Sequence, residues 1–170
     1  LYEDNNQKKT QVLNTIQSSI KSAKSTNEFI SNIHIITQSN IGAQTTQPIM
    51  SGAGKGFYNE LIDELKAAGK NASNATWLDK HNIIDTKFKL TSNDYICAYY
   101  SASTNSQAGI VVDVSRDAIY DAILNMELGS GSISGFISPG GTEITTDDTA
   151  KFALSDKELY PTLLQSKDKQ

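Results

Sequence analysis

The apolar run "GIVVDV" contains an acidic residue that two kinds of chemistry could use. Asp113 lies near the end of this run, and Ser115 follows it directly before an amphipathic segment. As a structural group, a carboxylate at this place accepts backbone N–H hydrogen bonds and favours the positive end of a helix dipole. As a functional group, it pairs with the ammonium of an amine or an amino acid. The sequence leaves both interpretations of Asp113 open.

Aromatic and polar side chains gather along the chain before this aspartate. Tyrosine and tryptophan combine an apolar wall with a hydrogen-bonding tip, which suits small polar ligands. We therefore predict a pocket for a small polar molecule beneath a loop at 70–86, and the residues expected to line it are Trp77, His81, Tyr95, Tyr99 and Asp113. Ordinary packing of these side chains in the core is the alternative.

The run "YICAYY" is expected to form a strand that carries part of this pocket. Strict alternation along a strand places every second side chain on the same face of the sheet. Tyr95 and Tyr99 would then share the pocket face with Cys97. A cysteine in so apolar a run is expected to be a buried, inert thiol.

Other kinds of site find little support. His34 falls inside an expected helix and His81 in an expected loop, and neither has a partner at a recognised metal-ligand spacing. The stretch "SGAGKGF" does not match the spacing of a phosphate-binding loop, and no nucleophile elbow is present. The sequence therefore predicts binding without catalysis, no cofactor and no metal.

Composition limits the partners. The chain of 170 residues has a net charge of −4, and its 15 Lys and Arg residues are scattered. Nucleic-acid binding needs a concentrated basic surface, so no nucleic-acid partner is expected. No apolar stretch approaches the length of about 20 residues that a membrane span needs. Both ends of the sequence are consistent with a domain cut from a longer protein, whose flanking segments would supply any contact with a membrane.

The pattern of apolar residues predicts an α+β fold. Residues 7–38 are expected to form one long helix of about 45 Å, which would protrude as a stalk and pair weakly in a homodimer. A second helix is expected at 57–70, strands at "TKFKL", "YICAYYSA" and "AGIVVDV", and a third helix from Ser115 with Ile119, Ile123 and Met126 on its buried side. A hairpin around "GG", a surface turn at "TTDDT" and a short helix in the tail complete the prediction. We divide the chain into a stalk and connector, 1–54, and a single sensing unit, 55–170.

Several segments, taken in order, resemble the Cache-type sensor domains of bacterial chemoreceptors and sensor kinases, which are extracytoplasmic and PAS-like. The matching segments are "GIVVDVS", "AIYDAIL", "GSGSISGFIS" and "GGTEI", preceded by "WLDKHNIIDTKF" and "DYICAYYS". The likeness covers about residues 55–150, and the N-terminal helix is similar to the stalk of such domains. It implies a long N-terminal helix followed by an antiparallel sheet flanked by helices.

The resemblance also implies roles for single residues. In members that bind amino acids, an Arg-x-Trp-Tyr cluster, a later tyrosine and a strand-end aspartate hold the ligand. Trp77 and Asp113 match these places, and Tyr95 or Tyr99 matches the tyrosine. The arginine is absent, because residue 75 is Ala and Leu78 follows the tryptophan. The class of small polar ligand therefore stays open.

We thus expect the extracellular sensor domain of a bacterial methyl-accepting chemotaxis receptor, signalling across the cell membrane through its long helix. A sensor kinase with the same domain is one alternative. A structural or assembly module that binds no ligand is the other.

Overall fold

The computed structural model describes residues 2–37, 43–45, 56–70, 75–91, 93–103, 108–126, 128–129 and 132–146. The helices are α1 (Tyr2–Thr26), α2 (Phe57–Ala67), α3 (Asn82–Phe88) and α4 (Arg116–Leu124). The strands are β1 (Ile30–Thr37), β2 (Ala43–Thr45), β3 (Thr76–Leu78), β4 (Tyr95–Ser103), β5 (Ala108–Ser115), β6 (Gly135–Ile137) and β7 (Glu143–Thr145). This is an α+β fold with a long N-terminal helix, which confirms the fold class expected from the sequence.

Five strands form the main sheet, in the order β2-β1-β5-β4-β3, and every neighbouring pair is antiparallel. The first strand of the chain therefore lies next to the fifth, in the middle of the sheet. This pairing makes β1 a central strand, buried on both faces. Residues 30–37 and 43–45 thus belong to the sheet, so its strands lie on both sides of the division expected at residue 54.

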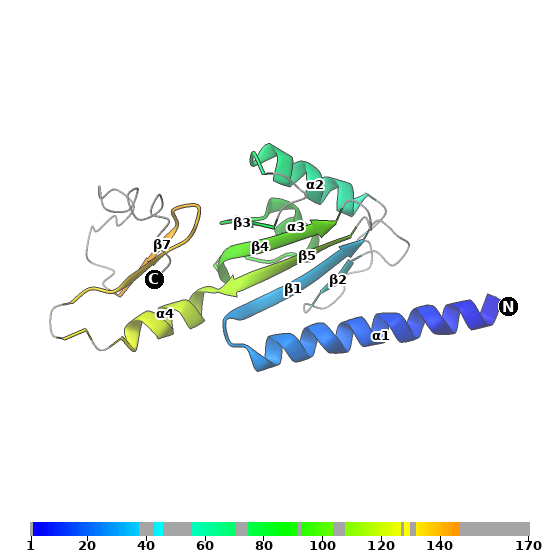
Figure 1. Cartoon of the computed structure of the whole chain (residues 1–170), viewed down its shortest axis with the longest axis horizontal. Helices are drawn as coiled ribbons and strands as arrows, with labels where there is room; N and C mark the ends of the chain where they lie inside the picture. Colours follow the sequence, from blue (N-terminus) through cyan, green and yellow to red (C-terminus); the bar gives the residue numbers. More distant parts are fainter. Residues whose placement is uncertain are drawn as a thin grey trace.

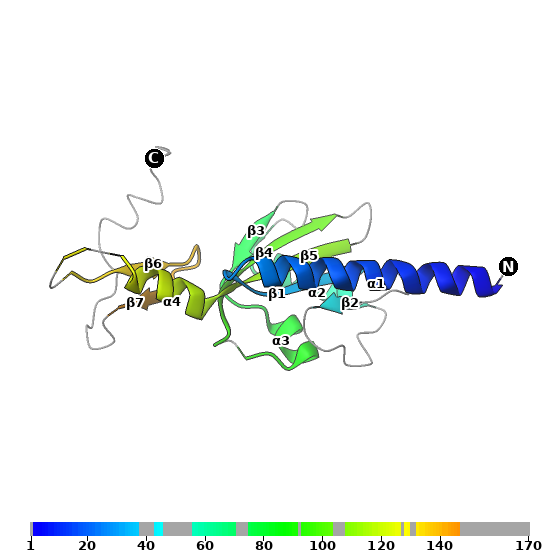
Figure 2. The same ribbon diagram turned by 90° about the horizontal axis from the view of Figure 1, so that it is seen from below.

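Helices cover both faces of the main sheet (Figures 1 and 2). Helices α2 and α3 lie on one face, and α1 lies along the other. The main core fills the space under α2 and α3, and its buried members are Ile36, Phe57, Tyr58, Leu61, Leu65, Ile84, Phe88, Ala98, Tyr100 and Val111. Burial of these side chains holds α2 and α3 against the strands.

The expectation of one helix over 7–38 is wrong beyond Thr26. Asn27 ends the helix in a turn, because its side chain accepts a hydrogen bond from the N–H of Phe29 at 3.0 Å and its carbonyl accepts one from Ile30 at 3.1 Å. The next segment, "ISNIHIIT", is rich in β-branched isoleucine, which favours strands. Its isoleucines also fit a helical spacing, and this ambiguity misled the sequence prediction.

Helix α1 is docked at one end only. Its N-terminal part extends past the edge of the sheet (Figures 1 and 2), and every side chain from 7 to 12 is exposed. Near its C-terminal end Ile20 is buried, 5% exposed, on the face of the sheet where Ile33 of β1 is also buried. The helix is therefore a rod held against β1 by a small apolar contact.

Replacing Ile20 by Ala should undock α1. We expect the substitution to lower the free energy of unfolding by about 2 kcal/mol and to speed amide hydrogen exchange in α1 without affecting α2. Val12→Ala is the matched control, because Val12 is 50% exposed. Denaturant titration and hydrogen exchange measure both effects, and equal behaviour of the two variants would show that α1 is not anchored at Ile20.

Strand β4 departs from simple alternation at its start. The pairing register with β5 shifts between Tyr95 and Cys97, which is a β-bulge. Tyr95 consequently lies on the α3 side of the sheet with Ala98 and Tyr100, whereas Cys97 packs in a second core. The prediction that Tyr95 shares a face with Cys97 and Tyr99 is wrong for this reason.

Some smaller predictions also need correction. The segment "TKFKL" forms no strand, because its first three residues end helix α3. The expected loop at 70–86 contains β3 and the start of α3. Met126 is exposed, unlike Ile123, which is buried as predicted. Ser115 is confirmed as the N-cap of α4, since its Oγ accepts a hydrogen bond from the N–H of Ala118 at 3.2 Å.

Strands β6 and β7 form the predicted hairpin, which lies beside α4 (Figure 2). Together they enclose a second core, whose buried members are Ile96, Cys97, Ile123 and Ile144. The "TTDDT" turn, the tail helix and most of the connector before α2 lie outside the described residues. Among the described residues, no helix combines the length and the apolar character needed to cross a membrane.

Asp79 connects the main sheet to this hairpin. Its carboxylate accepts hydrogen bonds from the Ser138 hydroxyl (2.8 Å), the Gly140 N–H (3.0 Å) and both the N–H (3.1 Å) and the hydroxyl (2.6 Å) of Thr142. These bonds outweigh the effect of burial and lower the pKa of Asp79. A Cβ atom at residue 140 would lie 2.4 Å from the carboxylate carbon, so this turn position requires glycine.

Asp79→Asn should loosen the hairpin, because an amide cannot accept all four hydrogen bonds. We expect a loss of about 2 kcal/mol in the free energy of unfolding, together with faster amide exchange at 135–145. Asp94→Asn is the control, since Asp94 is an exposed turn residue outside the hairpin. An unchanged exchange pattern in Asp79→Asn would contradict this role.

Candidate functional site

Asp113 lies at the centre of a buried polar cluster between the sheet and α3. Its Oδ2 is 3.1 Å from Nε2 of His34 and 3.3 Å from Nδ2 of Asn32, and its Oδ1 is 2.8 Å from Nε2 of His81. All four side chains are at most 1% exposed. A single carboxylate therefore receives hydrogen bonds from three side chains, which is how a buried charge is stabilised.

Three separate elements bring these side chains together. Asn32 is the direct partner of Asp113 across the β1–β5 pair, and His34 lies two residues further along the same face of β1. His81 immediately precedes α3, at its N-cap position. The cluster therefore connects β1, β5 and α3.

His81 faces a carboxylate at each ring nitrogen. Besides the contact of Nε2 with Asp113, its Nδ1 lies 2.9 Å from Oδ1 of Asp85, four residues further along the chain. The Tyr95 ring stacks on His81 with centroids 4.4 Å apart, and its hydroxyl donates to Oδ2 of Asp85 at 2.9 Å. The same hydroxyl accepts a hydrogen bond from the N–H of His81 at 3.2 Å.

The charges in the cluster favour a protonated His81. Burial alone opposes the charged ring, but the hydrogen bond and negative charge of Asp113, together with the charge of Asp85, raise the pKa of His81. Burial likewise opposes ionisation of Asp113, yet the hydrogen bonds from His34 and His81 lower the pKa of Asp113 to about 2. His81 thus lies between two carboxylates that favour its charged form.

Three polar atoms at this place are buried and have no hydrogen-bond partner among the described residues. They are the hydroxyl of Tyr100, Oδ1 of Asp85, which is close to Nδ1 of His81 but not hydrogen-bonded to it, and Oε2 of Glu64. The other Glu64 oxygen accepts hydrogen bonds from the first N–H groups of α3, at Asn82 and Ile83. A buried polar atom without a partner costs about 1–3 kcal/mol, so a hydroxyl in this state marks a place where a polar guest would be stabilised.

The cluster also has the composition of a metal site. Nitrogen atoms of His34 and His81 and an oxygen of Asp113 all lie within 4.8 Å of one another. Imidazole and carboxylate ligands of this kind suit zinc and related transition metals.

The five residues expected in the pocket separate into two groups. His81, Tyr95 and Asp113 are brought together. Trp77 and Tyr99 are paired across β3 and β4, with ring centroids 5.1 Å apart, on the opposite face of the sheet. Trp77 is 38% exposed. The structure thus divides the expected residues between two faces, and the buried group is closed to solvent.

His34 and Asn32 belong to the site but were not predicted for it. Both fall within the helix that the sequence predicts over 7–38, where they could not share a face with Asp113. The signal that could have found them is the period-two pattern of polar residues between isoleucines in "SNIHI".

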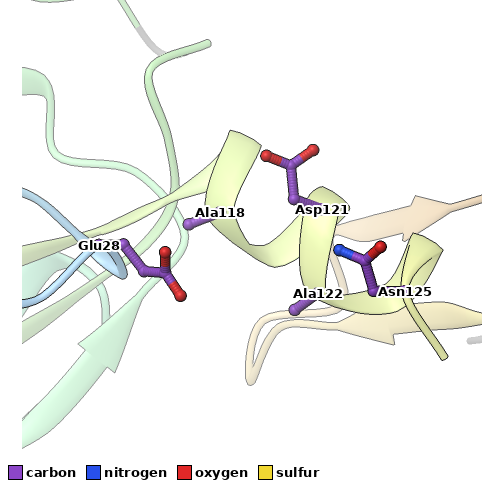
Figure 3. Close-up of a pocket in the computed structure, with 5 residues that line it drawn as sticks. All are labelled: Glu28, Ala118, Asp121, Ala122 and Asn125. Atoms are coloured by element: carbon purple, nitrogen blue, oxygen red, sulfur yellow. The ribbon is translucent and has the colours of Figure 1, made fainter.

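A surface depression lies between the α1–β1 turn and α4 (Figure 3). It is lined by Glu28, Ala118, Asp121, Ala122 and Asn125. The carboxylates of Glu28 and Asp121 are exposed and do not converge in Figure 3, so they form no defined binding geometry.

Cys97 is buried as predicted, and burial raises the pKa of its thiol to about 11, which makes it a poor nucleophile.

No protein-family model, no curated protein and no solved structure matches this chain.

The unfolding free energy of the metal-free chain should depend on pH through His81. A raised pKa in the folded state stabilises the fold below the unfolded value of about 6.5, and this stabilisation is lost as the pH rises through the folded value. We expect stability to fall on raising the pH from 6 toward 8 in buffer with EDTA, and the fall to be smaller in His81→Gln. Urea titrations measure it, with Tyr99→Phe as control; a flat profile in the parent chain would contradict a raised pKa at His81.

Proposed function

We propose that this chain is the extracytoplasmic sensor domain of a bacterial transmembrane receptor of the methyl-accepting chemotaxis type. The order of its segments resembles Cache-type domains, and its α+β architecture is the one that this resemblance implies. The observation that supports signalling best is the position of β1. One face of this strand carries Asn32 and His34 of the buried cluster, and the other carries Ile33 on the side of α1.

The proposed mechanism couples the site to the rod through β1. Only three residues separate α1 from β1, and the carbonyl of one of them, Phe29, accepts a hydrogen bond from the N–H of Ser115 in β5 at 2.8 Å. A ligand that rearranges the cluster would shift β1 against β5 and so change how α1 lies. Such a ligand signals only if its affinity differs between the two arrangements.

The proposed ligand is a small polar molecule held by His81, Tyr95 and Asp113. Because these side chains are buried, the ligand would reach them through movement of α3, where the partly exposed Asp85 lies. Trp77 and Tyr99 would need a different role in this scheme, since they lie on the other face. The exposed N-terminal part of α1 is proposed to pair in a homodimer, with the receptor's flanking segments reaching the membrane. A sensor kinase that carries the same domain would work in the same way.

A structural or assembly module is the second candidate. The burial of His34, His81 and Asp113 favours it, because a cluster closed to solvent can simply fasten α3 to the sheet. In that case α1 would mediate assembly without any response to a small molecule.

A ligand screen by thermal unfolding separates the two candidates. We expect one compound class among amino acids, amines, carboxylates and purines to raise the melting temperature. A ligand at 100 times its Kd adds about 2.7 kcal/mol, which is a shift of several degrees for a domain of this size. Tyr95→Phe should reduce the shift and Tyr99→Phe should not. No shift with any class would favour the assembly module.

A further inference from the structure

We propose that His34, His81 and Asp113 form a binding site for a divalent transition-metal ion, with Zn²⁺ as the preferred ion. The proposal does not depend on the sensor function, because it concerns only the donor atoms of the buried cluster. The sequence gives neither histidine a partner at a recognised metal-ligand spacing, but the fold brings both of them to Asp113.

The donor set selects the class of ion. Two imidazole nitrogens and one carboxylate are typical of zinc sites with three protein ligands, whereas Mg²⁺ and Ca²⁺ prefer oxygen ligands alone. The donor atoms are also close enough to share an ion. The Asp113 oxygens lie 3.1 Å from Nε2 of His34 and 2.8 Å from Nε2 of His81, near the separation of about 3.3 Å between ligands bonded to one tetrahedral zinc at about 2.0–2.1 Å.

A second layer of polar groups already orients these ligands. Oδ1 of Asp85 lies 2.9 Å from Nδ1 of His81, which leaves Nε2 directed at Asp113. A carboxylate on the outer nitrogen of a metal-binding histidine is the common arrangement in zinc proteins, where it fixes the tautomer and raises ligand basicity. The Asn32 side chain holds Asp113 in the same way, at 3.3 Å.

An independent observation supports a guest in the cluster. The hydroxyl of Tyr100 is buried and finds no hydrogen-bond partner in the part of the chain that the structure describes, and its ring lies edge-on to His81 with centroids 6.5 Å apart. A water molecule in the fourth position of a zinc ion with three protein ligands would give such a hydroxyl a partner. The nearby Glu64 and Asp85 carboxylates add negative charge that a divalent cation would offset.

The small number of histidines makes imidazole ligation of a bound metal easy to assign. The sequence contains only two histidines, and both belong to the cluster. Imidazole ligation of any bound metal, in a chain without a histidine tag, therefore has one source. The full chain should be stripped with EDTA and titrated with ZnCl₂ by isothermal calorimetry, with MgCl₂ and CaCl₂ as comparisons.

We expect one zinc per chain with a Kd of micromolar or lower, and no uptake of Mg²⁺ or Ca²⁺ at the same concentrations. His34→Gln, His81→Gln and Asp113→Asn should each weaken zinc binding by more than about 100-fold, and Asp85→Asn by about 10–100-fold. Asp121→Asn, on the exposed face of α4, is the matched control and should bind zinc like the parent chain.

X-ray absorption of the zinc-loaded parent chain identifies the zinc ligands directly, so this test does not depend on whether the variants fold. It should report two imidazole ligands and one or two oxygen ligands. The proposal is overturned if the parent chain takes up no zinc below millimolar concentration, if the absorption spectrum lacks imidazole ligands, or if a folded His34→Gln variant keeps the parent affinity.

Discussion

One buried carboxylate organises this domain. Asp113 is shielded from water and is held by two imidazoles and one amide, and these groups come from the neighbouring strand β1 and from the segment that leads into α3. Leaving such a charge without its partners would cost about 3–5 kcal/mol. The relative positions of β1, β5 and α3 are therefore mutually dependent, because a shift in any one of them breaks hydrogen bonds to the same carboxylate.

The two faces of the main sheet are packed differently. The face under α2 and α3 contains the polar cluster embedded in the main apolar core. The opposite face offers α1 a small contact around Ile20 and Ile33. Because β1 contributes to both faces, the proposed signalling mechanism needs no direct contact between helix α1 and the cluster. The α4 and hairpin unit is connected separately, through Asp79 and the second core.

Much of the architecture could be predicted from the sequence, since the α+β class, α2, α4 with its Ser115 cap, and the hairpin all have strong local signals. The strand β1 could not, because isoleucines at 30, 33 and 36 fit a helical stripe as well as a strand. A helix at 30–37 would keep His34 away from Asp113, so His34 could not be predicted as a site residue. It reaches Asp113 only because β1 pairs with β5. The β-bulge in β4 could not be predicted either, because a shift of one residue in strand pairing does not change the composition of the strand. This bulge places Tyr95 on the same face of the sheet as His81. His81 and Asp113, which are conspicuous in the sequence as polar residues beside buried runs, do meet in the buried cluster.

The most direct test of this account is a long-range ¹H–¹⁵N spectrum of the imidazole rings in the metal-free chain. With only two histidines, the assignment needs one variant. The account predicts that Nε2 of His81 carries a proton that is protected from exchange by its hydrogen bond to Asp113. An Nε2 atom of His81 that carries no proton, or whose proton exchanges freely with solvent, would contradict the buried carboxylate as the organising group.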